Sequence, residues 1–208
     1  MVTLSAAEAS NAKIATSLPI GMVAVFVGGT SGIGEYTLKN FAQNAKNPRI
    51  YLAGRSQDAA NRIISECTKL NPDGQYIFIQ SDVSLLKNVL PVCEQILSKE
   101  KCINLLFQTQ GGLGVEKTSE GLSRAYVLPF TSRILFVLGL LPALQKASGL
   151  KRVVSVFAAG YEGHFDENYW SEYVTKQPMK SRGHLAAMIT MAHNVLARKA
   201  PDYLGPCF

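Results

Sequence analysis

The stretch GGTSGIG, residues 28–34, has the composition of a loop that binds phosphate groups. It follows a short apolar run with β-branched residues and precedes a segment that predicts a helix. In such a strand–turn–helix unit, Gly28 permits a tight turn, Gly32 lets the backbone approach a pyrophosphate, and Gly34 lets the helix pack closely on the sheet. The amides that open the helix then face the phosphates. The stretch predicts a dinucleotide site, and the alternative is a glycine-rich turn without a ligand.

Arg55 follows a second apolar run, PRIYLAGRS at residues 48–56. A carboxylate at this point of a dinucleotide-binding unit would hold the adenosine ribose through its 2′-hydroxyl and repel a 2′-phosphate. The nearest acid, Asp58, lies three residues further on. A guanidinium can pair with a phosphate through two hydrogen bonds. Arg55 therefore favours NADP(H) over NAD(H), and the alternative is an ordinary exposed arginine.

The elements that must position these residues alternate between strands and helices. Apolar runs predict strands at 22–27, 48–56, 75–84, 103–112 and 151–160, and helical spacing predicts helices at 34–45, 58–70, 85–99, 130–148 and 181–200. Asp58 is the expected cap of the second helix, and Pro91 indicates a shifted start or a kink in the third. Right-handed βαβ units give a parallel sheet that is covered on both faces. We expect an N-terminal arm at residues 1–20 and one α/β domain at residues 21–208, a Rossmann-like doubly wound sheet.

The composition limits the classes of function. The chain has 208 residues, of which 47% are apolar and 17% charged, as in a soluble globular protein. The net charge of +6 comes from scattered Lys and Arg residues without a basic, aromatic-rich face, so no nucleic-acid partner is expected. The four cysteines have no metal-site spacing, so we expect no metal and free thiols. The longest apolar run, 134–144, is too short to span a membrane, and no signal segment is evident, so the protein is expected to be cytoplasmic.

Four short motifs follow the predicted strands in order: GGTSGIG, GR, SDVS and QGG. Together they resemble the short-chain dehydrogenase/reductase family over about residues 20–201. The last helix, RGHLAAMITMAHNVLARKAPD, resembles a divergent fungal branch that is often found in secondary-metabolite pathways. The resemblance implies a Rossmann-like fold and a nicotinamide cofactor. It also implies which residues bind that cofactor: Gly28, Thr30, Ser31, Gly32, Ile33 and Gly34 at the pyrophosphate, Arg55 at the 2′-phosphate, Asp82 and Val83 at the adenine, and Gln108, in QTQG where the family usually shows NNAG, near the ribose.

The catalytic residues that the resemblance implies are not recognisable in this chain. The family uses a Tyr with a Lys four residues on, a Ser that polarises the carbonyl, and an Asn. No Y-x-x-x-K follows the fifth strand, the serine column falls at Ala158, and no Asn lies between Leu105 and Glu167. The candidate catalytic residues are Ser155, Tyr169 and Tyr173, with Lys176 or Lys180 near the tyrosines and Tyr161, His164 and His184 as weaker substitutes. Alternatively, Ser155 is structural and these aromatic residues only pack the loop.

The family normally continues past the last helix with two more strands and a substrate lid, whereas this chain ends at PDYLGPCF. We therefore expect the sheet to lack the last family strands. The helices at 130–148 and 181–200 are the usual dimer faces in the family, which makes a homo-oligomer a candidate assembly.

The leading hypothesis is an NADP(H)-dependent oxidoreductase that reduces a small carbonyl compound or oxidises an alcohol in a secondary-metabolite pathway. The first alternative is a pseudoenzyme that binds nucleotide or acts as a scaffold subunit. A third hypothesis is a redox-neutral isomerase or cyclase.

Overall fold

The fold is built on a parallel sheet of five strands in the order β3–β2–β1–β4–β5. The computed structural model describes residues 3–112, 114, 116–167 and 178–199. The strands are β1 (Val23–Val27), β2 (Arg49–Gly54), β3 (Gln75–Gln80), β4 (Leu105–Gln108) and β5 (Arg152–Ser155). The chain order reverses direction between β1 and β4, which leaves a crevice at the carboxyl ends of these strands. The predicted Rossmann-like α/β class is confirmed.

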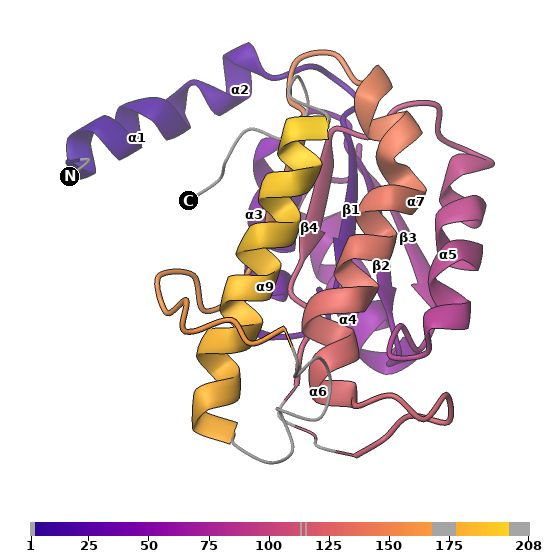
Figure 1. Cartoon of the computed structure of the whole chain (residues 1–208). Coiled ribbons are helices and arrows are strands. Elements are labelled where there is room, and N and C mark those ends of the chain that lie inside the picture. Colours follow the sequence, from indigo (N-terminus) through magenta and orange to yellow (C-terminus); the bar gives the residue numbers. More distant parts are fainter. Residues whose placement is uncertain (1–2, 113, 115, 168–177, 200–208) are drawn as a thin grey trace.

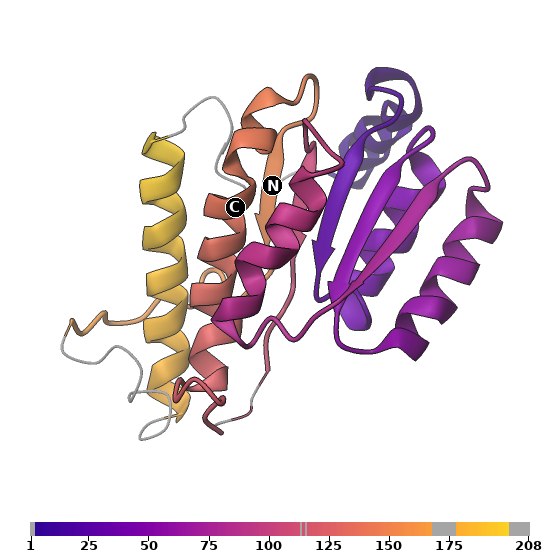
Figure 2. The same ribbon diagram turned by 90° about the vertical axis from the view of Figure 1, so that its right-hand side faces the viewer.

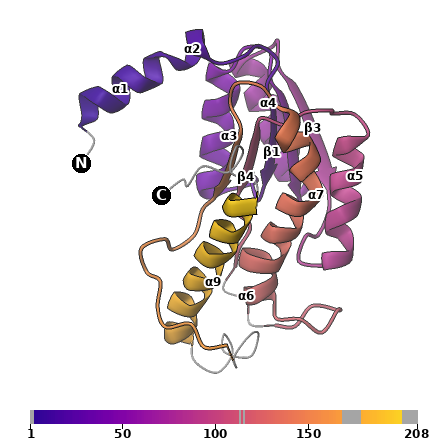
Figure 3. The same ribbon diagram turned by 45° about the horizontal axis from the view of Figure 1, so that its top comes forward.

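Helices cover both faces of the sheet. The helical elements of the described residues are α1 (Leu4–Ala12), α2 (Ile14–Ser17), α3 (Gly32–Asn44), α4 (Gln57–Leu70), η1 (Leu86–Asn88), α5 (Val89–Leu97), α6 (Arg124–Tyr126), the π-turn η2 (Val127–Thr131), α7 (Ser132–Lys146) and α9 (Pro178–Lys199). Figure 2 shows α3 and α4 on one side of the strands and α5, α7 and α9 on the other. The helices α1 and α2 extend away from the sheet at its N-terminal end (Figures 1 and 3).

The central strand β1 shows why its sequence is an unbroken apolar run. Val23, Val25 and Val27 belong to the core cluster on the α5 and α7 side of the sheet. Ala24 and Phe26 belong to the cluster on the α3 and α4 side. Because alternate side chains point to opposite faces, a strand that is covered on both faces needs apolar residues at every position.

The starts of α4 and α5 can be compared with the predicted ones. The α4 helix is capped by Ser56, whose hydroxyl accepts from the amide of Ala59 at 3.2 Å, so the prediction of Asp58 as the cap was wrong. Asp58 lies instead in the first turn, where its charge complements the helix dipole. The α5 helix begins at Val89, which puts Pro91 in the first turn, where a missing amide hydrogen costs little. This is the shifted start that Pro91 indicated.

The apolar helical run is longer than the sequence pattern predicted. From Arg124 to Lys146 it continues for 23 residues, and its most apolar stretch of 18 residues has a mean hydropathy of 1.9, enough in length and composition to cross a membrane. The expectation concerned the run 134–144 alone, which is one part of this longer helix. Half of its most apolar stretch is buried, and Phe136 and Leu140 are completely buried in the core. Its packing against the sheet accounts for its apolar character.

A network of charges joins α3 to α4. The carboxylate of Glu35 accepts two hydrogen bonds from Arg62, at 2.7 and 2.8 Å. It also accepts one from Lys39, which pairs with Glu66 as well. These hydrogen bonds, from Arg62 first, lower the pKa of Glu35 to about 2, although burial opposes the change.

Replacing Arg62 with glutamine should make stability less dependent on pH in the acidic range. A folded-state pKa below the unfolded value stabilises the protein above the unfolded pKa, and this contribution disappears as the pH falls towards about 2. Urea unfolding of both proteins between pH 7 and pH 2.5 measures the effect. The Arg62→Gln variant should lose less stability over this range than the parent, and parallel pH profiles would contradict the role of the network.

Candidate functional site

A cavity of about 170 Å³ lies at the carboxyl edge of the sheet, over the ends of β1, β2, β3 and β4. Residues at or just after the ends of these four strands line it, together with Leu128 of η2: Gly28, Thr30, Ser31, Ala53, Gly54, Arg55, Ser81, Asp82, Val83, Thr109, Gln110 and Gly111. The cavity thus brings together residues that the sequence assigned to the pyrophosphate, the 2′-phosphate and the adenine. Of the other residues assigned to the cofactor, Gly32, Ile33 and Gly34 open helix α3 beside it, and Gln108 ends β4.

Gly28, Gly32 and Gly34 each have a different physical reason to be glycine. At Gly28, φ is +86°, and a Cβ atom would lie 2.5 Å from the backbone nitrogen of Gln110. At Gly34, a Cβ atom would lie 2.5 Å from Oγ1 of Thr109 and 2.6 Å from the carbonyl oxygen of Gly28. At Gly32, φ is +55°, but nothing lies within 4 Å of a Cβ atom. Gly28 and Gly34 therefore allow close packing, and Gly32 leaves open space in front of the helix.

The start of helix α3 is suited to an anionic group. Ser31 is the N-cap residue, but its side chain makes no capping hydrogen bond. The first amides of a helix have no partner within the helix, and the helix dipole places a partial positive charge there. The open space at Gly32 gives a phosphate group access to these amides. The loop therefore fits the pyrophosphate of a dinucleotide.

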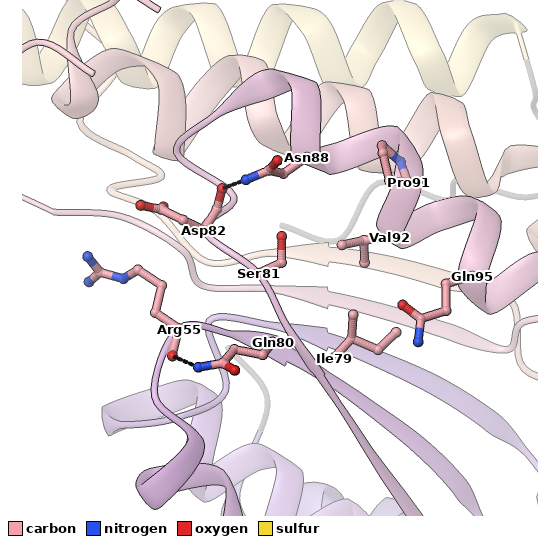
Figure 4. A pocket seen from close by; sticks show the side chains of 9 residues that line it. All are labelled: Arg55, Ile79, Gln80, Ser81, Asp82, Asn88, Pro91, Val92 and Gln95. Carbon is pink, nitrogen blue, oxygen red and sulfur yellow. Dashed lines mark hydrogen bonds between the residues drawn. The ribbon is translucent and has the colours of Figure 1, made fainter. Parts of the chain in front are cut away.

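A second, wider hollow of about 620 Å³ lies between β3 and α5 (Figure 4). It shares Arg55, Ser81 and Asp82 with the first cavity, so the two meet at the ends of β2 and β3. The carbonyl of Arg55 accepts from Nε2 of Gln80 at 3.1 Å, which fixes the backbone while the side chain stays exposed. Figure 4 shows Arg55 and Asp82 at the same end of the hollow.

Asp82 is held in a defined geometry at this junction. Its Oδ1 accepts from the amide of Ser84 at 3.0 Å and from the Ser84 hydroxyl at 2.6 Å, and its carbonyl accepts from Asn88 at 2.9 Å. Burial would raise the pKa of Asp82, but the Ser84 hydrogen bonds and the charges of Arg124 and Arg55 hold it below the ordinary value. The carboxylate is therefore charged at neutral pH and can accept a hydrogen bond from a ligand.

The two glutamines at the end of β4 have different surroundings. Gln108 is fully buried and does not line the cavity; its Nε2 donates to the carbonyl of Arg133 at 3.0 Å. Gln110 lines the cavity, is 4% exposed, and has no hydrogen-bond partner for either amide atom among the described residues. A buried amide without a partner is costly, so Gln110 has both a donor and an acceptor available for a bound ligand.

Arg133 is the feature of the site that sequence reasoning missed. It comes from the second position of α7 and is only 3% exposed. It donates through Nε and Nη2 to the carbonyl of Gln110, at 3.2 and 2.6 Å, and through Nη1 to Oγ of Ser155 at 2.7 Å and to the carbonyl of Val156 at 2.8 Å. Burial lowers the pKa of Arg133 to about 10, so it remains charged at neutral pH. A lone arginine in the run FTSRILFVLGLL was the only sequence signal.

Only one of the three candidate catalytic residues lies in the described part of the chain. Ser155 ends β5, is partly exposed, and accepts from Arg133, which leaves its hydroxyl hydrogen available to donate. Tyr169 and Tyr173 lie outside the described residues, as does Lys176. No role for these three residues is tested by the geometry.

The weaker substitutes occupy contrasting places. Tyr161 is 69% exposed, with the guanidinium of Arg182 over its ring, and His164 is also exposed. His184 is buried, stacks on Phe165 and accepts from the amide of Asp166 at 3.3 Å. Its packing role was one of the two predicted for it.

The described residues offer neither a metal site nor a reactive buried thiol. Within the described ranges, no group of three His, Cys, Asp or Glu side chains could hold a metal ion. Cys67, Cys93 and Cys102 are free, and burial raises the pKa of Cys67 to about 11 and that of Cys93 to about 12. These two thiols are therefore protonated at neutral pH.

The chain matches known proteins in sequence. The family model for short chain dehydrogenases matches residues 22–168. The chain is 44% identical over 165 residues to oxidoreductase AN1596 of Emericella nidulans, an alignment that covers 78% of this chain and 49% of that protein. The chain spans about half the length of the first curated relatives it matches.

Solved structures match the fold at low sequence identity. An NADP complex of Pseudomonas aeruginosa RhlG has a TM-score of 0.66 at 17% identity, covering 91% of this chain and 70% of that one. An NADH-dependent reductase, A1-R', complexed with NAD has a TM-score of 0.65 at 19% identity, covering 89% and 75%. At these identities the likeness concerns the arrangement of strands and helices.

Proposed function

The chain belongs to the short-chain dehydrogenase/reductase family, and from this premise we propose that it is an NADP(H)-dependent oxidoreductase acting on a small carbonyl compound or alcohol. Membership of the family implies a nicotinamide nucleotide cofactor; the preference for the 2′-phosphorylated form is our proposal. The observation that carries it is the cavity at the carboxyl edge, where the glycine loop and Arg55 line the same space. A phosphate-binding loop and an exposed guanidinium are the two features that recognition of NADP(H) needs.

Each lining residue has one task in this proposal. The amides at the start of α3, with Gly28, Thr30, Ser31, Gly32, Ile33 and Gly34, bind the pyrophosphate. Arg55 pairs with the 2′-phosphate, and Asp82 and Val83 hold the adenine. Gln110 offers its amide to the ribose or the nicotinamide, and Gln108 supports that wall from behind. The dinucleotide, when bound, supplies or accepts the hydride.

The substrate oxygen needs a hydroxyl donor near the end of β5. We propose Ser155 for this role, because its oxygen is already engaged by Arg133 and its hydrogen is free to reach a carbonyl or alkoxide oxygen. Tyr169 and Tyr173 are the proposed proton donors on the segment after β5.

The wider setting is part of the same proposal. We propose one Rossmann-like domain at residues 21–208 behind the arm at 1–20, a cytoplasmic location, and a place in a secondary-metabolite pathway. No nucleic acid or membrane is a partner in it. A second copy of the chain is proposed to pack on the helices at 130–148 and 181–200, where Leu138, Met191 and Val195 are exposed.

The pseudoenzyme alternative is not favoured, because the matched family and the relatives of the chain are oxidoreductases. It makes a separate prediction, since a pseudoenzyme would bind the dinucleotide and turn over no carbonyl substrate. A panel of ketones and aldehydes assayed with bound NADPH distinguishes the two.

Replacing Arg55 with alanine should lower the affinity for NADPH about 10- to 100-fold and change the affinity for NADH much less, because one charge-assisted phosphate contact is lost. The side chain is exposed, so the fold should be unaffected. Fluorescence titration of both dinucleotides measures the two affinities. Arg152→Ala is the matched control, since Arg152 is also exposed but starts β5 at the opposite edge of the sheet. Equal losses for NADPH and NADH in Arg55→Ala, or no binding of either by the parent protein, would refute the proposed preference.

A further inference from the structure

Arg133 is a buried positive charge without a negative partner. Its four hydrogen bonds go to two carbonyl oxygens and one hydroxyl, and in the part of the chain that the structure describes no carboxylate pairs with it. His193 on α9 is a titratable group that feels this charge, and burial keeps the pKa of His193 below its ordinary value. Burying a cation with neutral partners costs several kcal/mol. A neutral side chain could tie the same loops together at lower cost.

The guanidinium lies directly behind one half of the cavity. Gln110 and Gly111 form the cavity wall on the β4 side. Two guanidinium nitrogens bind the carbonyl of Gln110, and a Cβ atom on Gly111 would lie 3.9 Å from Nη2. The remaining nitrogen reaches Ser155 and Val156 at the end of β5. The charge is therefore fixed between the ends of β4 and β5.

This is the half of the crevice that the nicotinamide end of the proposed cofactor occupies. With the pyrophosphate at the start of α3 and the adenosine at Arg55 and Asp82, beyond β2, an extended dinucleotide must run its other nucleoside towards β4 and β5. The nicotinamide ring carries a positive charge in the oxidised form and none in the reduced form. A fixed cation nearby repels the first and leaves the second unaffected.

We propose that Arg133 makes this site discriminate between the redox states of its cofactor, so that it binds the reduced dinucleotide more tightly than the oxidised one. The proposal rests on the proposed function. It adds which redox form of the cofactor the site binds when both forms are present. Two unit charges on the order of 10 Å apart, in surroundings with an effective dielectric constant of about 20, change an affinity about tenfold. The charge is buried, so salt screens little of this effect.

The test compares the affinities of NADPH and NADP+ in the parent protein and in variants of Arg133, by isothermal titration calorimetry. The parent should bind NADPH about tenfold more tightly than NADP+, and this ratio should fall about tenfold in Arg133→Gln. Arg133→Lys keeps the charge and should keep the ratio within about twofold. Arg152→Gln, at the opposite edge of the sheet, should leave both affinities unchanged.

The ratio separates a charge effect from a structural one. Loosening of the β4 and β5 ends would lower the affinities for NADPH and NADP+ alike. Loss of the charge would instead raise the affinity for NADP+ relative to that for NADPH. A ratio that is the same in Arg133→Gln and the parent would overturn the inference while leaving the proposed function intact. If neither form binds the parent, the proposed function and the inference both fail. Should Arg133→Gln not fold, Arg133→Met is the second neutral variant, and equal affinities in the parent alone would refute the inference.

Discussion

Replacing Gly28 with alanine is expected to lower the free energy of unfolding by about 3 kcal/mol or more and to abolish dinucleotide binding. The backbone at Gly28 has a φ of +86°, which an L side chain rarely adopts. The added methyl group would also lie 2.5 Å from the backbone nitrogen of Gln110 and 2.9 Å from the carbonyl carbon of Thr109. Both contacts are with backbone atoms, so the strain cannot be relieved by a rotamer change, and the ends of β1 and β4 must separate.

Gly32→Ala is the matched comparison in the same loop. Gly32 also has a positive φ, +55°, but no atom lies within 4 Å of the added methyl group. We expect a loss of about 1 kcal/mol from backbone strain alone. Urea unfolding measures stability, and NADPH fluorescence measures binding. Equal stability losses in the two variants would show that close packing at Gly28 is not what requires a glycine.

Replacing Asn104 with leucine is expected to cost about 3 kcal/mol, because three buried or partly buried backbone groups lose their partner. Asn104 is 5% exposed and lies just before β4. Its Oδ1 accepts from the amide of Val23 at 3.0 Å, and its Nδ2 donates to the carbonyls of Ser148 and Leu150 at 3.1 and 3.0 Å. One side chain therefore connects the starts of β1 and β5, and the position of Ser155 depends on it.

The control for this substitution is Asn44→Leu at the end of α3. Asn44 also donates through Nδ2 to a carbonyl, that of Asn40 at 2.8 Å, but it is exposed, so water replaces the lost partner. We expect a change within about 0.5 kcal/mol. Thermal and urea unfolding of both variants measure the difference. A loss in Asn104→Leu no larger than in Asn44→Leu would mean that this connection contributes little to the fold.

The phosphate-binding unit and the fold class could be predicted from the sequence, because both depend on local patterns. An apolar run covered on both faces, a glycine loop and a helix follow one another directly in the chain, so Gly28, Gly32 and Gly34 could each be given a physical reason. Arg55 and Asp82 follow two strands of a parallel sheet, and the carboxyl ends of such strands meet at one edge. Their meeting at one cavity could therefore be predicted without knowledge of the tertiary contacts.

The side chains behind that cavity were decided by the tertiary structure. Helical periodicity says that Arg133 lies on a helix, but only the packing of α7 on the sheet brings its guanidinium to Gln110 and Ser155, more than twenty residues away in either direction. That Gln110 lines the cavity while Gln108 does not has the same origin, since Gln108 is held by a hydrogen bond to the carbonyl of Arg133. The cap at Ser56 depended on the backbone conformation at the start of α4, which determines the side chain that reaches a free amide. Sequence patterns fix what a residue's neighbours along the chain require, whereas a buried charge is positioned by neighbours that only the folded chain supplies.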